Sequence, residues 1–450
     1  MTSTINAEAS RRSARRAPSA RPRAGTGTGA APTPEEAGPT TVFGRALARL
    51  DTPSTSYYVI VGATAALVLI GLVMVLSASM ITSYKDDGSA FAVFADQAKY
   101  AALGSVVALV AARISPTWWR RLAVPSLAIA LVLQMLVFVP GLGVEAGGNR
   151  NWLRLPAGLS MQPSELTKIG LVLVGALVLT NKRHRLGQFR HVLIPFLVPV
   201  AAVTLLLVLA GRDLGTALVL LGIVAAVLWV AGVPARLFLA TVLTGAVTAF
   251  VLVMSSPNRM GRITNWLSAE CANDPDGACG QSVHGLYALA DGGWWGVGLG
   301  ASKEKWAWLP EPHNDFIFAI IGEELGLPGT LVVLGIFAAL ATACRRLIVR
   351  TDDQFVRIAT GGVLGWILLQ ATINIGAVIG LLPVVGVPLP FVSSGGSALV
   401  TTMLAMGILV SFARHEPGAG EALANRPGVV RRSLAVLPRP WRGRRHRWLG

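Results

Sequence analysis

The sequence predicts an all-α integral membrane protein, a bundle of about ten transmembrane helices with a large extracytoplasmic loop between helices 7 and 8. Three observations support this fold class. Apolar residues make up 53% of the 450 residues and charged residues only 14%, whereas soluble domains carry about 25% charged residues. Apolar runs of about 20 residues, the length that crosses a bilayer as a helix, recur along the chain. The excess positive charge lies at the two ends.

The ends of the chain carry most of the net charge of +16. Residues 1–50 contain eight Arg and three Glu, and residues 414–450 contain nine Arg and two Glu. Residues 1–50 have almost no aromatic side chains, so they cannot bury enough surface to offset chain entropy. We expect a disordered cytoplasmic tail at 1–50, a membrane domain at 51–413, a basic cytoplasmic tail at 414–450 and no nucleic acid partner.

Ten apolar runs are candidates for membrane spans. They lie at 57–80, 94–112, 122–140, 163–180, 192–210, 215–232, 236–255, 316–343, 356–381 and 397–413. Only the GRDLG turn at 211–215 separates the fifth run from the sixth, so a single re-entrant hairpin remains an alternative for that pair. An even number of spans puts both termini on one side, and the positive-inside rule makes it the cytoplasmic side.

This orientation leaves nine basic residues on the outer side, against twelve in the inner loops. The outer ones are Lys85, Lys99, Arg150, Arg154, Arg212, Arg259, Arg262, Lys303 and Lys305. Because the positive-inside rule disfavours this placement, an anionic substrate would explain it. Two outer segments, 141–162 and about 256–315, are longer than a connection needs, and long loops in compact domains are typically functional.

A glycine pattern lies in the second of these loops. GVGLGA at 296–301 matches the spacing of a dinucleotide-binding fingerprint, and Asp315 follows at a plausible distance. No predicted strand precedes the pattern, and Pro310 and Pro312 break any helix that would follow it, as the fingerprint requires. We therefore expect these glycines to serve tight backbone turns at the membrane surface.

The same loop ends in PEPHNDF, which places Glu311, His313 and Asp315 directly before the eighth span. One interpretation is structural: Asn314 or Asp315 caps the first amides of the helix. A second is catalytic: Asp315 is a general base beside a helix N-terminus that attracts anions, oriented by His313. A third is a metal site formed by the three side chains, although no fourth ligand is identifiable and the metal is unknown.

Ionisable residues within the spans mark function or paired structure. Glu165 and Lys168 lie three apart at the start of the fourth span, within reach of each other. This arrangement fits a self-neutralising structural pair or a substrate site. Further charges and amides lie in the other spans: Asp213 beside Arg212, Glu323 beside Glu324, and Gln370 four residues before Asn374. We expect Gln370 and Asn374 to form interhelical hydrogen bonds.

The segment PLPFVSSGGSALV at 388–400 opens the tenth span. Pro388 and Pro390 interrupt the chain before a glycine- and serine-rich stretch. Free amides at such a helix start bind anions such as phosphate. Tight helix packing is the competing interpretation.

Two cysteines lie in the large outer loop. Cys271 and Cys279 flank seven residues that include Pro275 and Gly277, which favour a turn. Since the predicted location is oxidising, we expect a disulfide between them. Cys344 lies at the cytoplasmic end of its span and is expected to stay reduced.

These motifs, in this order, resemble FtsW/RodA-type proteins of the SEDS (shape, elongation, division, sporulation) family over about residues 57–413. The specific matches are NRNWLRL, QPSELTKIG, RDLGTA, GGWWGVGLG, WLPEPHNDFIFAIIGEELG and LPFVSSGGSALV. The runs LSASMITSY at 76–84 and ARHEP at 413–417 are more similar to the division member of high-GC Gram-positive bacteria. Departures from the family pattern occur at Asn151, Arg212, Asn314 and Ser394.

The resemblance implies a peptidoglycan glycosyltransferase that polymerises lipid II into glycan strands on the outer face of the cytoplasmic membrane, at the division septum. It implies a class B penicillin-binding transpeptidase and other division membrane proteins as partners. The family's catalytic acidic residue falls on Asp315, the base of an inverting transfer. The candidate substrate-binding residues are Arg150, Arg154, Gln162, Ser164, Glu165, Lys168, Asp213, Arg259, Arg262, Glu311, His313, Ser394, Gly395, Gly396 and Ser397.

Basic residues among these are candidates to hold the pyrophosphate leaving group, with or without a divalent cation, Mg or Mn. The alternatives are a lipid II flippase and a non-catalytic division scaffold. A flippase would carry polar residues in the inner half and the core of the spans, whereas here they gather at the outer surface and in the outer loops.

Overall fold

Long apolar helices form most of the part of the chain that the structure describes. The computed structural model describes residues 52, 54–146, 149–154, 160–255, 257–268, 280–306, 309 and 311–424, all within the unit that begins at Thr52. Nine helices in this part are long and apolar enough to cross a membrane. They are α2 (Thr55–Asp87), α3 (Ala92–Ala111), α4 (Pro116–Leu136), α5 (Pro163–Asn181), α8 (Leu214–Ala231), α9 (Ala235–Met254), α12 (Ile317–Arg350), α13 (Gln354–Val378) and α14 (Ser397–Arg414).

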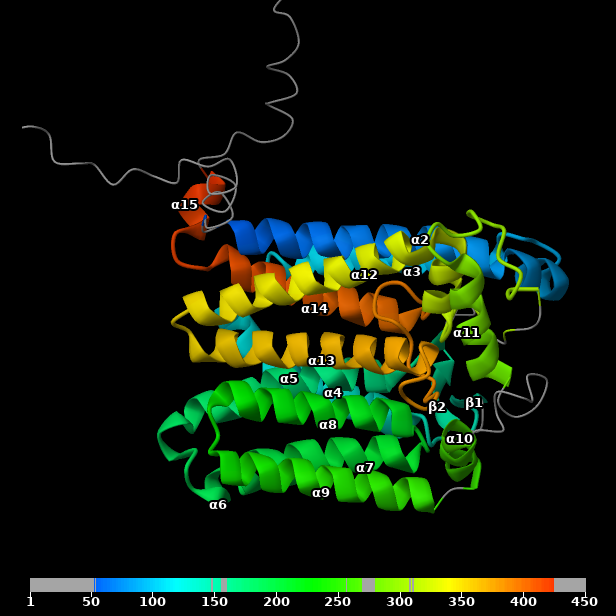
Figure 1. Cartoon of the computed structure of the whole chain (residues 1–450). Coiled ribbons are helices and arrows are strands. Elements are labelled where there is room, and N and C mark those ends of the chain that lie inside the picture. The colour runs from blue at the N-terminus through cyan, green and yellow to red at the C-terminus, as the bar shows by residue number, and fades with distance from the viewer. Residues whose placement is uncertain are drawn as a thin grey trace, which may run out of the picture. The chain divides into compact units, whose positions relative to one another are not determined.

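The fifth predicted span has a different backbone. It consists of α6 (Phe189–Val192), the π-helical segment η3 (Leu193–Ala202) and α7 (Val203–Ala210). Pro195 and Pro199 lie in this segment and lack amide donors, so a regular α-helical ladder cannot run through it. Figure 1 shows α6 at the end opposite the strands, and α7 packs beside α8. The fifth and sixth segments therefore each run along the bundle, and they do not form the re-entrant hairpin.

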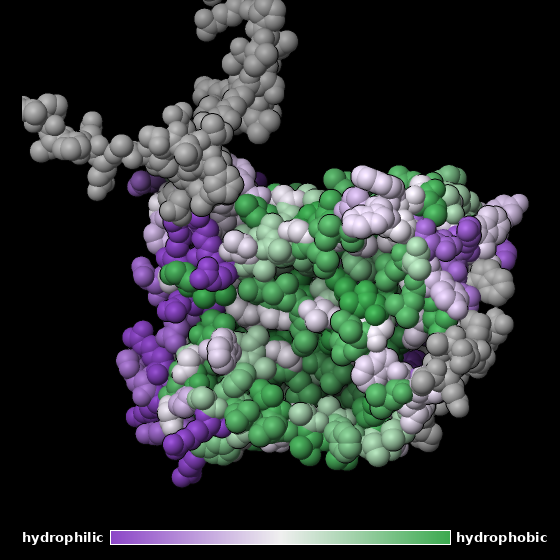
Figure 2. Space-filling model, in the orientation of Figure 1, coloured by the Kyte–Doolittle hydropathy of each residue, from purple (hydrophilic) through white to green (hydrophobic). Residues whose placement is uncertain are grey.

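The helices run between two ends that differ in structure (Figure 1). We call the end with the strands, α10 and α11 the loop end. We call the end where α2 begins and α14 stops the tail end. Apolar side chains cover the middle of the visible face, and hydrophilic ones gather toward the ends (Figure 2). This band is the surface expected of a protein that crosses a bilayer.

Burial is uneven across the bundle. The apolar windows of α5 and α14 are the most buried of the nine, and that of α9 the least. Leu237 is the buried residue of α9, which packs against α8 and α10 (Pro257–Leu267). α5 lies against α4, α8 and α13, so the polar start of α5 is enclosed by other helices.

The loop end contains regular structure that the sequence patterns did not predict. A three-stranded antiparallel sheet of order β1 (Gly143–Ala146), β2 (Asn149–Arg154) and β3 (Ser160–Met161) occupies the first long segment. Two helices, α10 and α11 (Gly280–Gly292), occupy the second. The segments are too short and too polar for a span-based pattern to identify these elements.

The glycine pattern at 296–301 follows a helix, α11, and packs against a kink in α12. Gly326 has φ 65° and ψ −162°, a backbone conformation that interrupts the helix. The carbonyls of Glu323 and Glu324 accept hydrogen bonds from the amides of Val297 (2.9 Å) and Gly298 (3.0 Å). The expectation of turn-forming glycines is thus confirmed, and the dinucleotide fingerprint is excluded.

Some predicted features lie in parts of the chain that the structure does not describe. The disulfide between Cys271 and Cys279, the predicted tail at 1–50 and residues 425–450 of the predicted tail at 414–450 lie outside the described residues. Cys344 is a buried free thiol in α12.

Candidate functional site

Asp315 lies at the loop end, two residues before α12, and is half-buried. Its backbone carbonyl accepts a hydrogen bond from Asn374 Nδ2 on α13 (2.8 Å). Within the described residues, no hydrogen bond or ion pair engages its carboxylate. Gly386 lies beside the carboxylate: a Cβ at that position would be 3.7 Å from Asp315 Oδ2.

The N-cap interpretation of this segment is wrong. The capping position of α12 is Phe316, and no side chain of the described residues caps the helix. The backbone carbonyls of the preceding residues are held from elsewhere, since Asn314 O accepts from Ser393 Oγ (2.7 Å) and His313 O accepts from the amide of Ser394 (2.9 Å). The Asp315 segment is thus fixed through its backbone, and its carboxylate is not required for helix capping.

The pKa of Asp315 is raised from 3.8 to about 6, chiefly because burial disfavours the charged carboxylate. The negative charge of Glu311 raises this pKa further, and the positive charge of Arg262 lowers it. Arg262 belongs to α10, and its guanidinium donates to the carbonyl of Val384 (3.2 Å). A carboxylate with a pKa near 6 is mostly ionised at neutral pH and remains basic enough to take a proton.

Glu311 and His313, the other two members of the predicted trio, form no hydrogen bond to the Asp315 carboxylate in the described structure. Glu311 is exposed with φ 53°, and its Oε2 lies 3.6 Å from His313 Nε2. Burial lowers the pKa of His313, opposed by the charge of Glu311. No hydrogen bond joins His313 to Asp315 among the described residues, and this part of the chain contains no group of three His, Cys, Asp or Glu arranged to hold a metal. The metal interpretation therefore has no support in the described geometry.

A small pocket adjoins Asp315. Its walls come from the Asp315 segment, from α13 and from the loop after it, and they comprise Asp315, Phe316, Ile373, Asn374, Ala377, Val378 and residues 384–387. Asn374 donates to both Asp315 O and Val387 O (2.9 Å), and its Oδ1 is buried without a hydrogen-bond partner in the described structure. The side-chain amide of Asn374 thus fixes two walls of the pocket, and its Oδ1 remains an unused hydrogen-bond acceptor within the described structure.

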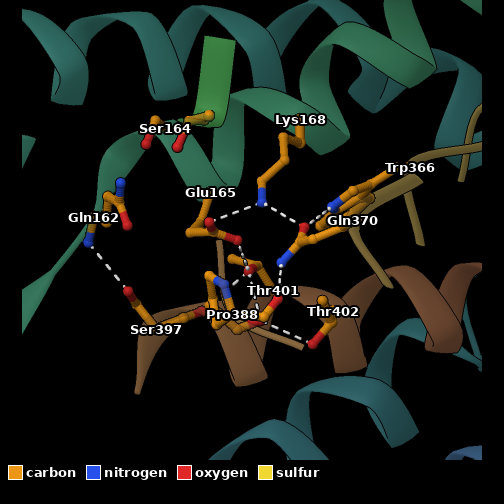
Figure 3. A network of polar contacts seen from close by, with 12 residues as sticks. Gln162, Ser164, Glu165, Lys168, Trp366, Gln370, Pro388, Ser397, Thr401 and Thr402 are labelled. Atoms are coloured by element: carbon orange, nitrogen blue, oxygen red, sulfur yellow. Dashed lines mark hydrogen bonds and ion pairs between the residues drawn. The ribbon is translucent and has the colours of Figure 1, made fainter. Parts of the chain in front are cut away.

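Glu165 and Lys168 form the predicted pair inside the bundle (Figure 3). The Lys168 ammonium lies 2.7 Å from Glu165 Oε1, and both side chains are almost fully buried. Lys168 also donates to Gln370 Oε1 (3.3 Å) and lies 4.8 Å from the ring centroid of Trp366. Glu165 Oε2 accepts from Thr401 Oγ1 on α14 (3.2 Å). Both charges therefore have several partners, and the expected interhelical bond of Gln370 is confirmed. The same expectation is wrong for Asn374, whose side chain donates to carbonyls outside the helices.

Asp213 is a structural cap. Its carboxylate accepts from the amide and the hydroxyl of Thr216 (2.9 and 2.7 Å), which caps the N-terminus of α8. It also accepts from Asn151 Nδ2 of β2 (2.8 Å) and from Gln162 Nε2 (2.7 Å). Four hydrogen bonds saturate this carboxylate. Asp213 and Gln162 therefore join the sheet to the starts of α5 and α8.

The segment at 388–397 connects the polar region around Lys168 with the polar region around Asp213. Pro388 O accepts from Gln370 Nε2 (2.9 Å), and Ser397 Oγ accepts from the amide of Gln162 (3.1 Å) (Figure 3). Gly396, with φ 40°, precedes α14 without a side-chain cap and lies against Tyr100. Ser394 and Gly395 are half-buried beside it. Ser164, by contrast, is fully buried and its hydroxyl lacks a partner in the described structure.

The candidate arginines line the same end. The amide of Arg150 in β2 donates to Gly211 O (3.0 Å), and the guanidinium of Arg259 in α10 donates to Arg212 O (2.8 Å). Arg154 is exposed at the end of β2. Their side chains form no ion pairs within the described residues. β2, the 211–213 turn, α10 and the loop beside Asp315 are therefore neighbours, so the segments that carry Arg150, Arg259 and Arg262 lie close together.

A second buried ionic cluster was only half predicted. Glu324 pairs with Lys305 (3.0 Å) and accepts from Ser77 Oγ of α2 (2.7 Å). Glu323 accepts from Ser302 Oγ and from the amide of Lys303 (both 2.6 Å). The sequence indicated the glutamates but not these partners. Trp366 and Thr401 were missed in the same way, because their types are ordinary in apolar helices.

Comparisons with known proteins agree with this architecture. The chain matches the family model FTSW_RODA_SPOVE, described as "Cell cycle protein", over residues 58–417. It is 44% identical over 418 residues to "Probable peptidoglycan glycosyltransferase FtsW" of Mycobacterium tuberculosis, covering 92% of this chain and 78% of that relative.

Two solved structures share the fold. One is described as "Structural coordination of polymerization and crosslinking by a peptidoglycan synthase complex", with a TM-score of 0.63, 26% identity and coverage of 79% of this chain and 97% of that one. The other is the rod shape determining protein RodA of Thermus thermophilus, with a TM-score of 0.58, 25% identity and coverage of 80% and 97%. From the family match over most of its length and from these relatives, the chain belongs to the FtsW/RodA/SpoVE family of cell cycle proteins.

Proposed function

We propose that this chain is a peptidoglycan glycosyltransferase that polymerises lipid II into glycan strands during cell division. The family membership and the relatives' names support the activity. The single observation that carries the catalytic assignment is the Asp315 carboxylate, which lies beside a pocket, lacks a hydrogen bond within the described residues and has a pKa of about 6. The neighbouring carboxylates of Glu165 and Asp213 are held by other side chains.

In the proposed reaction, the 4-hydroxyl of an acceptor sugar attacks the anomeric carbon of a lipid-linked donor. The new glycosidic bond forms as the bond from that carbon to the pyrophosphate oxygen breaks, and the anomeric centre inverts. Asp315 takes the hydroxyl proton. The pyrophosphate leaves with the electron pair, so its negative charge must be stabilised by cations.

Arg262 and Arg259 are the best-placed cations for this task. Each uses its guanidinium for one or two backbone carbonyls, which leaves donors unused. Lys168 is buried and already paired with Glu165. It therefore contributes its positive electrostatic field and stabilises the packing of α5. The described residues do not fit a resident metal, and a divalent cation that accompanies the pyrophosphate would belong to the substrate.

The orientation of the chain follows from the same proposal. Asp315 must face the outer side, where the glycan strand forms, so the tail end and both termini are cytoplasmic and the chain resides in the cytoplasmic membrane at the septum. The peptidoglycan synthase complex among the structural neighbours supports a class B penicillin-binding transpeptidase as partner. Reporter fusions at Lys182 and after Arg414 should report cytoplasm, and a fusion after Gly277 the outside.

Purified protein incubated with fluorescent lipid II tests the function, with polymer detected on a gel. Wild type should form glycan strands, and Asp315→Asn should lower the rate by about 10² or more because an amide cannot accept the proton. Its expression and thermal stability should remain at least those of wild type. A folded Asp315→Asn protein that polymerises at the wild-type rate would refute the mechanism.

The flippase is the rival function. The chain in sealed vesicles with lipid II in both leaflets distinguishes the two, because a flippase changes the leaflet distribution without forming polymer. The polar clusters favour the enzyme, since those around Asp315, Asp213 and Glu324 lie at the loop end.

A further inference from the structure

A pocket at the tail end, opposite Asp315, plays no part in the proposed reaction. It lies where α5 ends and α6 begins, and its walls include Lys182, Arg190, His191, Phe189 and Ile194. Lys182 is the C-cap residue of α5, directly after Asn181. In Figure 1, α6 lies at the lower left, and Figure 2 shows hydrophilic residues gathered at that corner.

The local sequence explains how the pocket forms. After α5, the chain makes a short 3-10 turn at Arg183–Arg185 and enters α6 at Phe189. The following π-helical segment contains Pro195, another wall of the pocket. Since proline lacks the amide donor of a regular helix and its ring crowds the preceding turn, the start of this span departs from α-helical geometry beside the end of α5.

The charge of this pocket is not neutralised. Residues 181–191 contain Lys182, Arg183, Arg185 and Arg190, and residues 166–212 contain no Asp or Glu. Within the described residues, Lys182, Arg190 and His191 form no side-chain ion pair or hydrogen bond. Two carboxylates at the tail end, Asp353 and Glu416, are engaged by Arg120 and Arg350 instead.

Apolar side chains accompany these cations. Phe189 is 52% exposed and Ile194 56% exposed, and both line the same pocket as the basic residues. Cations beside exposed apolar groups, at the end of a membrane span, match a phospholipid at the interface, with its phosphate near the cations and its acyl chains along the helix. A soluble anion would not need Phe189 and Ile194.

We propose that this pocket binds the headgroup of an anionic phospholipid from the membrane leaflet at the tail end. Its cations lie on two elements, the end of α5 and α6, so a bound phosphate bridges the two spans. Orientation of the chain by positive charge accounts for basic residues in the loop. It does not account for the concave arrangement of Lys182 and Arg190 around exposed apolar side chains.

The test uses the full chain purified in detergent with phosphatidylcholine, titrated with phosphatidylglycerol or cardiolipin. Native mass spectrometry counts the retained lipids, and the thermal midpoint is followed in parallel. Lys182→Gln with Arg190→Gln should weaken anionic lipid binding on the order of 20-fold, about fivefold for each charge near the headgroup. Arg183→Gln with Arg185→Gln is the matched control, because it removes the same charge from residues that do not line the pocket, and it should change binding less than threefold.

Equal losses in the two double variants would overturn the proposal, because they would show general attraction to a basic loop. Retention of phosphatidylcholine as strong as that of the anionic lipids would overturn it as well. Glycerol phosphate at matched concentration should not compete, and effective competition would mean a site for a free anion. If the Lys182 and Arg190 variant does not fold, Phe189→Ala, which keeps every charge, should still reduce lipid retention several-fold.

Discussion

The carboxylates at the start of α5 and α8 and the carboxylate before α12 lie at the same end of the bundle in contrasting surroundings. Glu165 is paired with Lys168 at 2.7 Å, and Asp213 receives four hydrogen bonds. The backbone around Asp315 is fixed by hydrogen bonds to the carbonyls of His313 and Asp315. The Asp315 carboxylate has no partner in the described structure. Charged groups buried in a membrane protein are costly unless paired, so the unpaired group is the one available for chemistry.

The difference also separates two roles of polar residues. The Glu165 region fixes the packing of α5, α13 and α14, and the same network holds the loop that borders the Asp315 pocket through Gln370 and Pro388. We therefore expect substitutions in the first region to affect stability first and activity second. Substitutions at Asp315 should do the reverse.

Removal of one member of the buried pair should have the largest effect. Lys168→Met leaves Glu165 buried without its cation, which should cost about 3–5 kcal/mol of stability, measured by thermal unfolding in detergent. Glu165→Gln combined with Lys168→Met should recover part of the loss. Lys99→Met is the matched control, because the Lys99 and Asp96 pair is exposed and such pairs contribute about 0–1 kcal/mol. Equal losses in the two single variants would contradict the role of burial.

Loss of the amide that fixes the pocket should come next. Asn374→Ala removes the hydrogen bonds to Asp315 O and Val387 O, each worth about 1 kcal/mol. A displaced carboxylate lowers the rate by about tenfold or more, visible in kcat from polymerisation time courses. Thr402→Val is the control, since in the described part of the chain the Thr402 hydroxyl bonds carbonyls of its own helix. A normal kcat in Asn374→Ala would remove Asn374 from the positioning of Asp315.

The raised pKa of Asp315 predicts a stability gain on its removal. The stabilisation from a raised carboxyl pKa is fully present below pH about 4 and is lost as the pH rises through about 6. Two pKa units correspond to about 3 kcal/mol, which partial exposure of the carboxylate to solvent reduces to about 1 kcal/mol. Asp315→Asn should therefore be about 1 kcal/mol more stable than wild type at pH 7.5 and indistinguishable at pH 4. A destabilised variant at pH 7.5 would indicate a structural carboxylate.

The smallest effect concerns the pH dependence of polymerisation. Because a base must be ionised, the rate should rise with pH through a midpoint near 6. Glu311→Gln removes a negative neighbour and should lower the midpoint by a few tenths of a unit, and Arg262→Gln removes a positive one and should raise it. Rates measured from pH 5 to 8 test this, and shifts of the same sign in both variants would contradict the assignment of the titrating group to Asp315.

The membrane bundle could be predicted from the sequence alone. Span length, apolar content and the polar turns between runs are local properties, so nine of the ten predicted segments correspond to long apolar helices and the remaining one to the helix broken by Pro195 and Pro199. The pairing of Glu165 with Lys168 was also predictable, because residues three apart on a helix are neighbours. The location of Asp315 directly before a span was predictable as well.

The tertiary structure alone decided which of these charges are engaged. Glu324 finds Ser77 from a helix 247 positions away in the chain, and Gln370 reaches Lys168 across 202 positions. Neither contact follows from spacing, because helix packing sets it. The same packing places Gly386, Asn374 and Arg262, from three separate segments, around Asp315 and leaves its carboxylate without an ion pair among the described residues. The sequence determined that charged groups lie among apolar helices, and only the packing of distant segments determined which of them are neutralised and which can react.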